Sequence, residues 1–478
     1  MAKQPMLKFV TVNRDMPEKR DATVRSKDFD EIYAEFAAAK AAEQASRCSQ
    51  CGVPYCQNHC PLHNNIPDWL NLTATGRLEE AYQVSQATNT FPEICGRICP
   101  QDRLCEGNCV IEQSGHETVT IGAVEKYITD TAWENGWVKP ITPAQERPES
   151  VGIIGAGPGG LAAADMLRRA GVQVTVYDRY DRAGGLLTYG IPGFKLEKDV
   201  VMRRNDQLAQ AGVNFVMNCE IGKDVTFAEL REKHDAIIVA TGVYKSRDLG
   251  GPGAGAKGIV KAIDYLTASN RVANFGDTVA EYESGELNAA GKKVVVIGGG
   301  DTAMDCVRTA IRQGAESVKC LYRRDRANMP GSQRETKNAE EEGVVFEWLT
   351  APKGFKGDTV EAVIVDKMRL GAPDASGRQS PEVIEGSEYD EPADLVIKAL
   401  GFEPEELPTL WDQPELEVTR WGTIKAEFTT GRTAMPGVYA VGDIVRGASL
   451  VVWAIRDGRD CAEALLSDLN AKAAVAAE

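Results

Sequence analysis

Two segments of this 478-residue chain each pass from an apolar strand through a glycine-rich turn into a helix pattern. In the first, residues 151–160 read VGIIGAGPGG and place Gly155, Gly157 and Gly160 in a G-x-G-x-x-G turn. Gly155 permits the tight turn, Gly157 lets the backbone approach a pyrophosphate, and Gly160 lets helix and strand pack closely. The helix N-terminus then offers free N–H groups to the phosphates. The segment predicts a dinucleotide-binding βαβ unit.

The strands that follow support this prediction. Residues 172–177 form a second strand that ends at Asp178, a carboxylate placed to accept hydrogen bonds from ribose hydroxyls. A lone glycine motif is weak evidence, but strand, helix, second strand and acid together are strong. Residues 236–242 and 438–443 are further apolar strands with terminal glycines. Asp443 is placed to bond a ribityl hydroxyl, although a carboxylate there alone is more typical of a turn.

The same pattern recurs at residues 292–303, KKVVVIGGGDTA, as a G-x-G-x-x-A turn. The next strand, 318–322, ends not in an acid but in Arg323 and Arg324. An arginine at this position suits a 2′-phosphate, so the second site is predicted to prefer NADP over NAD. The adjacent Asp325 weakens that preference, and the alternative for the arginines is a solvated charge pair. The apolar strand 394–401 repeats the role of 236–242.

Eight of the twelve cysteines lie close together near the start of the chain. The first run is Cys48, Cys51, Cys56 and Cys60, and the second is Cys95, Cys99, Cys105 and Cys109. Short spacings with a proline after a cysteine are typical of 4Fe–4S sites. A disulfide framework belongs to short secreted domains, and the N-terminus lacks the apolar core of a signal peptide. Zinc is the stronger rival, but zinc sites usually pair two Cys-x2-Cys knuckles and only one occurs here.

The remaining composition narrows the class of protein. A net charge of −16 is expected to repel nucleic acid and anionic lipid, and no apolar run approaches the roughly 18 residues of a membrane span. We therefore expect a cytoplasmic protein with reduced thiols that binds neither nucleic acid nor membrane. Residues 1–145 are expected to form helices and loops. Apolar residues at helical spacing predict one core-facing helix between residues 26 and 45: Phe29, Ile32, Tyr33 and Phe36. A proline-rich linker follows at 139–148.

Five stretches carry a resemblance to a known family: 48–56 (CSQCGVPYC), 60–69 (CPLHNNIPDW), 91–109 (FPEICGRICPQDRLCEGNC), 184–192 (GGLLTYGIP) and 322–324 (YRR). On these motifs the chain resembles, nearly end to end, the small (β) subunits of bacterial NADPH-dependent glutamate synthases. The resemblance implies an electron-input subunit. It would oxidise NADPH and pass a hydride to FAD. Single electrons would then travel through two 4Fe–4S clusters to a large (α) subunit that makes L-glutamate from L-glutamine and 2-oxoglutarate, in a hetero-oligomer.

The resemblance also implies an α/β fold. It consists of two Rossmann-like dinucleotide-binding domains, glutathione-reductase-like or adrenodoxin-reductase-like, preceded by an α-helical iron–sulfur domain. The iron–sulfur domain would span 1–145. The FAD domain would combine 146–250 with 428–478, and 251–427 would be an inserted NADPH domain. Hydride transfer needs no general acid or base, so no catalytic residue is expected.

The binding residues follow from the motifs. The FAD contacts implied are Gly155, Gly157, Gly159, Gly160, Asp178, Gly185, Leu186, Thr241, Gly242, Gly442 and Asp443. The NADPH contacts implied are Gly298, Gly300, Asp301, Thr302, Ala303, Arg323 and Arg324. The resemblance assigns Cys48, Cys51, Cys56 and Cys109 to one cluster, and Cys60, Cys99 and Cys105 to the other. The fourth ligand of the second cluster is either Cys95 or Glu125.

Two other functions remain open at this point. The same module resembles the electron-input part of dihydropyrimidine dehydrogenases and of NADPH–ferredoxin oxidoreductases, which would change the acceptor. A non-catalytic alternative is a zinc-stabilised nucleotide-binding scaffold. Its purified protein would be colourless, whereas a brown protein with releasable FAD would exclude it.

Overall fold

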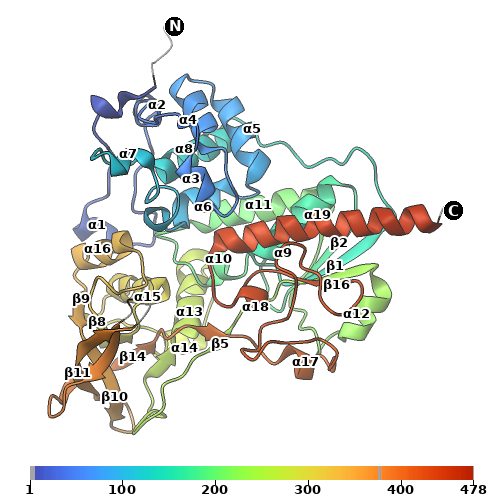
Figure 1. Ribbon diagram of the computed structural model, residues 1–478. Helices are drawn as coiled ribbons and strands as arrows, with labels where there is room; N and C mark the ends of the chain where they lie inside the picture. Colours follow the sequence, from blue (N-terminus) through green and yellow to red (C-terminus); the bar gives the residue numbers. More distant parts are fainter. Residues whose placement is uncertain (1–5, 375–376, 378, 477–478) are drawn as a thin grey trace.

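The computed structural model describes residues 6–374, 377 and 379–476, and its helical N-terminal part lies across two α/β domains (Figure 1). The extreme N-terminus, where no signal peptide is expected, lies outside the described residues. Among the described helices, none is long and apolar enough to cross a membrane.

The first α/β domain is built on a five-stranded parallel sheet with the order β16-β4-β1-β2-β3. Its strands are β1 (Ser150–Ile154), β2 (Gln173–Tyr177), β3 (Asn214–Val216), β4 (Ala236–Val239) and β16 (Val438–Ala440). The apolar runs suit a parallel sheet that helices cover on both faces. Helices α9 (Pro158–Arg169) and α19 (Val451–Ala476) pack together along it (Figure 1). The domain's other helices are α10 (Leu186–Tyr189), α11 (Lys198–Gln210), α12 (Phe227–Lys233) and α18 (Asp443–Arg446).

The second α/β domain repeats this plan in the order β6-β14-β7-β8-β9. Its strands are β6 (Ile259–Lys261), β7 (Lys293–Ile297), β8 (Ser317–Tyr322), β9 (Val345–Trp348) and β14 (Leu395–Lys398). Its helices are α13 (Ala262–Phe275), α14 (Ala280–Glu283), α15 (Asp301–Arg312) and α16 (Gln333–Glu341). A small antiparallel sheet extends it: β10 (Thr350–Lys356), β11 (Ala362–Pro373), β12 (Gln379–Val383) and β13 (Tyr389–Pro392). The α/β fold class with two Rossmann-like domains is thereby confirmed.

The two chain segments that join these domains pair with each other. Strand β5 (Lys245–Ser246) lies antiparallel to β15 (Phe402–Glu403). After β15, helix α17 (Leu407–Leu410) and Trp411 pack into the core of the first domain, where the Trp411 ring stacks on Phe227 at 5.1 Å. Residues after β15 lie within the expected inserted segment 251–427, and they contact the first domain. The part after β15 contacts the first domain because its apolar side chains complete that core.

The N-terminal part consists of short helices around the cysteines. They are η1 (Lys8–Val10), α1 (Ala22–Arg25), α2 (Ala38–Ala45), α3 (Tyr55–Asn58), α4 (Ile66–Ala74), α5 (Leu78–Thr88), α6 (Pro92–Ile98), η2 (Gln101–Arg103), α7 (Val110–Gln113) and α8 (Ile121–Glu134). The prediction of one helix between residues 26 and 45 is wrong: residues 26–37 are not helical. The Arg20 N–H donates to the Ile32 carbonyl at 2.9 Å, so the backbone pairs with a neighbouring segment instead. Ile32 and Phe36 are nevertheless buried.

Buried ion pairs join the helical part to both α/β domains. Glu93 on α6 pairs with Arg204 on α11 at 2.8 Å. Arg25 on α1 pairs with Glu342, directly after α16, at 3.0 Å. All four side chains are almost completely buried. Since a buried charge is costly without its partner, these contacts hold the three parts together as one packed body.

Candidate functional site

A cavity of about 1140 Å³ opens at the carboxyl ends of β1 and β4, where parallel sheets usually bind ligands. Most of the first set of predicted residues line it: Gly155, Gly157, Gly159, Asp178, Leu186, Thr241, Gly242, Gly442 and Asp443. Gly160 and Gly185 do not line the cavity. They allow close packing instead, because a Cβ at Gly160 would overlap the Gly155 carbonyl oxygen and one at Gly185 would lie 2.9 Å from the Gly157 Cα.

The turn at Gly155 requires glycine for two reasons. Its φ is 109°, in the region that L side chains rarely adopt, and a Cβ there would overlap the Ala240 carbonyl oxygen. Asp178 closes this turn, since its carboxylate accepts the Ala156 N–H at 2.7 Å and the Tyr180 N–H at 2.8 Å. Burial raises the pKa of the Asp178 carboxyl. Asp178 therefore shapes the turn in addition to facing the cavity.

Asp443 begins α18 after Gly442, whose φ is 73°. Burial raises the pKa of the Asp443 carboxyl to about 6. Sequence reasoning missed Asp457, which supports this corner. Its carboxylate accepts the Gly442 N–H at 3.3 Å and pairs with Arg446 at 2.6 Å. No local sequence pattern marks Asp457, because it lies on α19, outside the strand and turn that contain Gly442.

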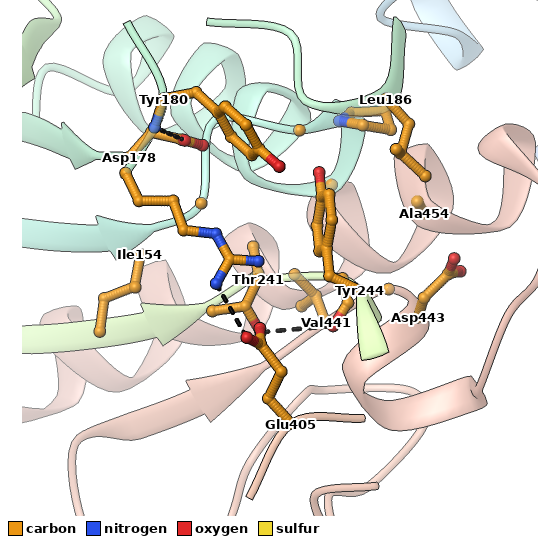
Figure 2. A pocket seen from close by; sticks show the side chains of 18 of the residues that line it. Ile154, Asp178, Tyr180, Leu186, Thr241, Tyr244, Glu405, Val441, Asp443 and Ala454 are labelled. Carbon is orange, nitrogen blue, oxygen red and sulfur yellow. Dashed lines mark hydrogen bonds and ion pairs between the residues drawn. The ribbon is translucent and has the colours of Figure 1, made fainter. Parts of the chain in front are cut away.

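Sequence reasoning also missed a polar and aromatic wall of the same cavity (Figure 2). Arg179 pairs with Glu405 at 2.9 Å and lies over the Tyr244 ring at 4.9 Å. The rings of Tyr180 and Tyr244 lie 6.0 Å apart. Glu405 comes from the segment after β15, which the sequence analysis assigned to the inserted domain. This wall adds flat apolar surfaces and a partly buried charge pair to a cavity suited to an extended nucleotide.

The second glycine turn repeats the geometry of the first. The Ala399 N–H donates to the Ile297 carbonyl at 2.9 Å, as the Ala240 N–H donates to Ile154 at 2.8 Å. A Cβ at Gly298 would overlap the Ala399 carbonyl oxygen. Gly300 caps α15, and Ala303 is fully buried beneath the turn. Asp301 and Thr302, at the start of α15, line a second cavity of about 1370 Å³.

The two arginines follow β8, as predicted. Arg323 is exposed and Arg324 is half-buried, and neither forms an ion pair within the described part of the chain. The Asp325 carboxylate accepts the Asn328 N–H at 2.9 Å and its side-chain amide at 2.8 Å, so it is engaged in a local turn. The cationic pair is therefore available to a phosphate while the neighbouring acid is not aimed at a ribose.

Three parts of the chain form the second cavity. Cys99 and Arg97 reach it from the helical part, Leu186 and Leu450 from the first α/β domain, and Asp301 from the second. Leu186 and Leu450 also line the first cavity. The wall between the two cavities is thus shared, and one predicted metal ligand faces it from the far side.

The four cysteines expected to ligate one of the two clusters line one small cavity of about 320 Å³: Cys48, Cys51, Cys56 and Cys109. Its other walls are mostly apolar. Burial raises the pKa of the Cys48 thiol to about 11 and that of Cys56 to about 12. Buried thiolates require a cationic centre to compensate them, so this arrangement fits a bound metal cluster. Among the described residues, no three metal-binding side chains gather closely enough for a single metal ion.

The remaining candidate ligands lie within electrostatic reach of one another: Cys60, Cys95, Cys99, Cys105 and Glu125. Glu125, on α8, accepts long hydrogen bonds from the Asn64 and Asn89 side chains at 3.4 and 3.3 Å. No ion pair of the described residues includes it, and burial raises the pKa of its carboxyl to about 8. A hydrogen bond with Cys95, then burial, raises the pKa of the Cys99 thiol.

Two family models match the chain. Residues 25–137 match "Dihydroprymidine dehydrogenase domain II, 4Fe-4S cluster". Residues 149–458 match "Pyridine nucleotide-disulphide oxidoreductase". The first match favours iron–sulfur over zinc for the cysteine-rich part.

Curated relatives match over nearly the whole chain. The glutamate synthase (NADPH) small chain of Azospirillum brasilense is 68% identical over 483 residues, covering 100% of both chains. The protein of the same name from Escherichia coli (strain K12) is 45% identical and covers 98% of this chain and 99% of its own. Among solved structures, Mycobacterium tuberculosis FprA in complex with NADPH matches with a TM-score of 0.58 and 22% identity. That match covers 69% of this chain and 86% of FprA and shows the shared fold.

Proposed function

Because this chain belongs to the family of NADPH-dependent glutamate synthase small chains and is an NADPH-dependent oxidoreductase, we propose that it is the electron-input subunit of a glutamate synthase. It would oxidise NADPH and deliver electrons to a large (α) subunit that makes L-glutamate from L-glutamine and 2-oxoglutarate. We place this hetero-oligomer in the cytoplasm, in keeping with the charge and the reduced cysteines.

The observation that carries this proposal is the cavity shared by three parts of the chain. Asp301 of the second glycine turn, Leu450 beside the first cavity and Cys99 of the cysteine-rich part all face it. A nucleotide bound at the second turn and one bound in the first cavity would meet at the Leu186–Leu450 wall. An electron carrier held by Cys99 would adjoin the same wall. The arrangement supports electron flow inward from a nucleotide and outward through the cysteines.

The residues of the first cavity would hold FAD and those of the second turn would hold NADPH. When bound, a flavin links a two-electron hydride donor to one-electron iron–sulfur carriers. The chain's own residues bind and orient: Gly155 and Gly298 admit the backbone to a pyrophosphate. Arg323 and Arg324 would select the 2′-phosphate. Leu186 and Leu450 keep the shared wall apolar.

We propose two 4Fe–4S clusters. Cys48, Cys51, Cys56 and Cys109 would ligate the outer cluster, and Cys60, Cys99 and Cys105 the inner one. For the fourth inner ligand we propose Glu125 in place of Cys95. A buried carboxylate with only two long amide hydrogen bonds lacks compensation for its charge, which a metal centre would provide. Cys95 instead has the Cys99 thiol as a hydrogen-bonding neighbour.

The domain division that we propose follows the β5–β15 pairing. The iron–sulfur domain takes residues 1–145, the FAD domain takes 146–246 with 402–478, and the NADPH domain is inserted between them. The core contacts of Trp411 support the second boundary.

Reconstitution tests the function. The purified chain should restore NADPH-dependent conversion of L-glutamine and 2-oxoglutarate to L-glutamate by a separately purified large subunit from the same cell. If it reduces a ferredoxin or supports pyrimidine reduction instead, and leaves the large subunit inactive, the acceptor assignment is wrong. A colourless, zinc-containing product without flavin would favour the scaffold.

A further inference from the structure

Four cationic side chains line the second cavity, which three parts of the chain form, and three of these cations are neutralised by ion pairs. Carboxylates 2.6–2.9 Å away pair with them: Glu31 with Arg97, Asp130 with Lys126 and Asp305 with Lys195. The fourth is Arg334, near the start of α16. It forms no ion pair within the described part of the chain, and its Nε is buried without a hydrogen-bond partner. A single unpaired cation in a partly buried cavity indicates that an anion belongs there.

The adjacent Ser332 points to the same conclusion. Ser332 lines the cavity and is only 3% exposed, and its side-chain hydroxyl is buried without a hydrogen-bond partner. The backbone holds Ser332 against the second glycine turn. The Ser332 N–H donates to the Asp301 carboxylate at 3.0 Å, and the Gly331 N–H donates to the Gly299 carbonyl at 2.9 Å. Two buried polar atoms without hydrogen-bond partners, the Ser332 hydroxyl oxygen and the Arg334 Nε, therefore belong to residues next to the turn that approaches a pyrophosphate.

We infer that Ser332 and Arg334 bind the diphosphate of the dinucleotide held at the second glycine turn. This inference rests on the proposed function, because it takes that turn to be the NADPH site. It adds two contacts that no glycine motif includes, and it divides the work among the arginines. Arg323 and Arg324 recognise the 2′-phosphate, whereas Arg334 recognises the part that NADP and NAD share.

The same arginine connects the nucleotide site to the inner cysteines. The Arg334 guanidinium donates to the Gln101 side-chain oxygen at 2.7 Å, and the Gln101 amide donates to the carbonyls of Cys95 and Gly96, each at 3.1 Å. Gln101 is 2% exposed. Drawing Arg334 towards a bound diphosphate would therefore alter the hydrogen bonding of the loop that carries Cys99.

The test measures binding of NADP⁺ and NAD⁺ to the purified full-length flavoprotein by the change in flavin absorbance. Arg334→Leu should weaken both ligands about 10- to 100-fold, leaving the ratio of their affinities unchanged. Ser332→Ala should weaken both by a smaller factor, and Arg334→Lys should recover part of the loss. Arg323→Ala should instead weaken the binding of NADP⁺ selectively, so that the affinity for NADP⁺ relative to NAD⁺ falls.

Two controls separate binding from domain packing. Arg103 donates to the Pro330 carbonyl across the same interface. If loss of packing between the domains does not explain the weaker binding in Arg334→Leu, Arg103→Leu should leave the affinities for NADP⁺ and NAD⁺ unchanged. Arg326, exposed and paired with Glu340 at 2.7 Å, is the matched surface arginine. An equal loss in Arg103→Leu and Arg334→Leu would overturn the inference, and so would unchanged affinities in Arg334→Leu and Arg334→Lys.

A spectroscopic readout tests the connection through Gln101. Binding of NADP⁺ to the dithionite-reduced wild type should shift the electron paramagnetic resonance signal of one cluster, and Arg334→Leu should abolish that shift at saturating NADP⁺. A shift that persists in the variant would contradict the connection. If the wild type binds no NADP⁺ at all, the proposed function fails, whereas normal wild-type binding with an unaffected variant removes only this inference.

Discussion

Cys99 of the helical part and Leu450 of the first α/β domain line the same cavity, and Leu450 also lines the neighbouring one. This shared lining places a proposed cluster ligand near the wall that separates the two proposed nucleotide sites. The inner cluster should therefore receive electrons before the outer one, whose cysteines form a separate cavity. Cys99→Ser should leave flavin reduction by NADPH intact and block electron delivery to the large subunit. Loss of flavin reduction itself would argue against this order.

The glycine turns at Gly155 and Gly298 can be tested with a matched pair of variants. Gly155→Ala and Gly298→Ala would each drive a Cβ into a carbonyl oxygen, that of Ala240 or Ala399. We expect Gly155→Ala to lose bound flavin and Gly298→Ala to retain it while binding NADPH at least about tenfold more weakly. Flavin released per chain and NADPH titration measure the two effects. Exchanged phenotypes would reverse the cofactor assignment.

The 2′-phosphate preference that we propose would rest on Arg323 and Arg324. Replacing both by alanine should raise the KM for NADPH about 10- to 100-fold, because two charge-assisted contacts are lost, and should leave the KM for NADH nearly unchanged. Initial rates with each coenzyme give the comparison, with Arg326→Ala as control. An equal loss for NADPH and NADH would show that these arginines act on packing.

The fourth ligand of the proposed inner cluster is either Glu125 or Cys95, and two variants distinguish these possibilities. We expect Glu125→Ala to lower the iron bound per chain by one cluster, and Cys95→Ser to keep both clusters. Iron and acid-labile sulfide assays on anaerobically purified protein decide the question. The reverse pattern would make Cys95 the ligand and Glu125 a buried acid.

The ion pairs of Glu342 set a pH-dependent contribution to stability. Hydrogen bonds and charges of Arg308 and Arg312 outweigh burial and lower the pKa of Glu342 to about 2 from its ordinary 4.5. The stabilisation is therefore fully present above pH 4.5 and is lost as the pH falls towards 2. Glu342→Gln should reduce the free energy of unfolding by about 3 kcal/mol at neutral pH, and by less below pH 4.5.

Urea unfolding at several pH values measures this difference. Glu340, an exposed α16 carboxylate paired with Arg326, provides the control. Glu340→Gln should change stability by less than about 1 kcal/mol. A Glu342→Gln loss that does not shrink at low pH would exclude the ionised carboxylate as its source.

The sequence predicted the features that depend on local pattern. Gly155, Gly298 and the strand after each helix are recognisable because spacing and glycine alone determine the turn. The grouping of Cys109 with the first cysteine run came only from family resemblance, since no local rule brings Cys109 back to Cys48.

Non-local contacts account for the failures. The helical spacing of Phe29 and Tyr33 predicted a helix, but backbone pairing with residues 18–20 holds that segment extended. Glu405 and Trp411 follow the inserted domain in sequence, yet their core and ion-pair partners lie in the first domain. Ser332 and Arg334 belong to no motif, and only the folded cavity reveals that the Ser332 hydroxyl and the Arg334 Nε are buried without hydrogen-bond partners.

Anaerobic rapid mixing of the intact chain with NADPH tests whether electrons pass from NADPH through a flavin to the iron–sulfur clusters. We expect flavin absorbance to be lost on mixing and electrons then to appear on an iron–sulfur cluster, detected by electron paramagnetic resonance of frozen samples. A flavin that stays oxidised in protein containing its full iron and FAD would contradict this expectation.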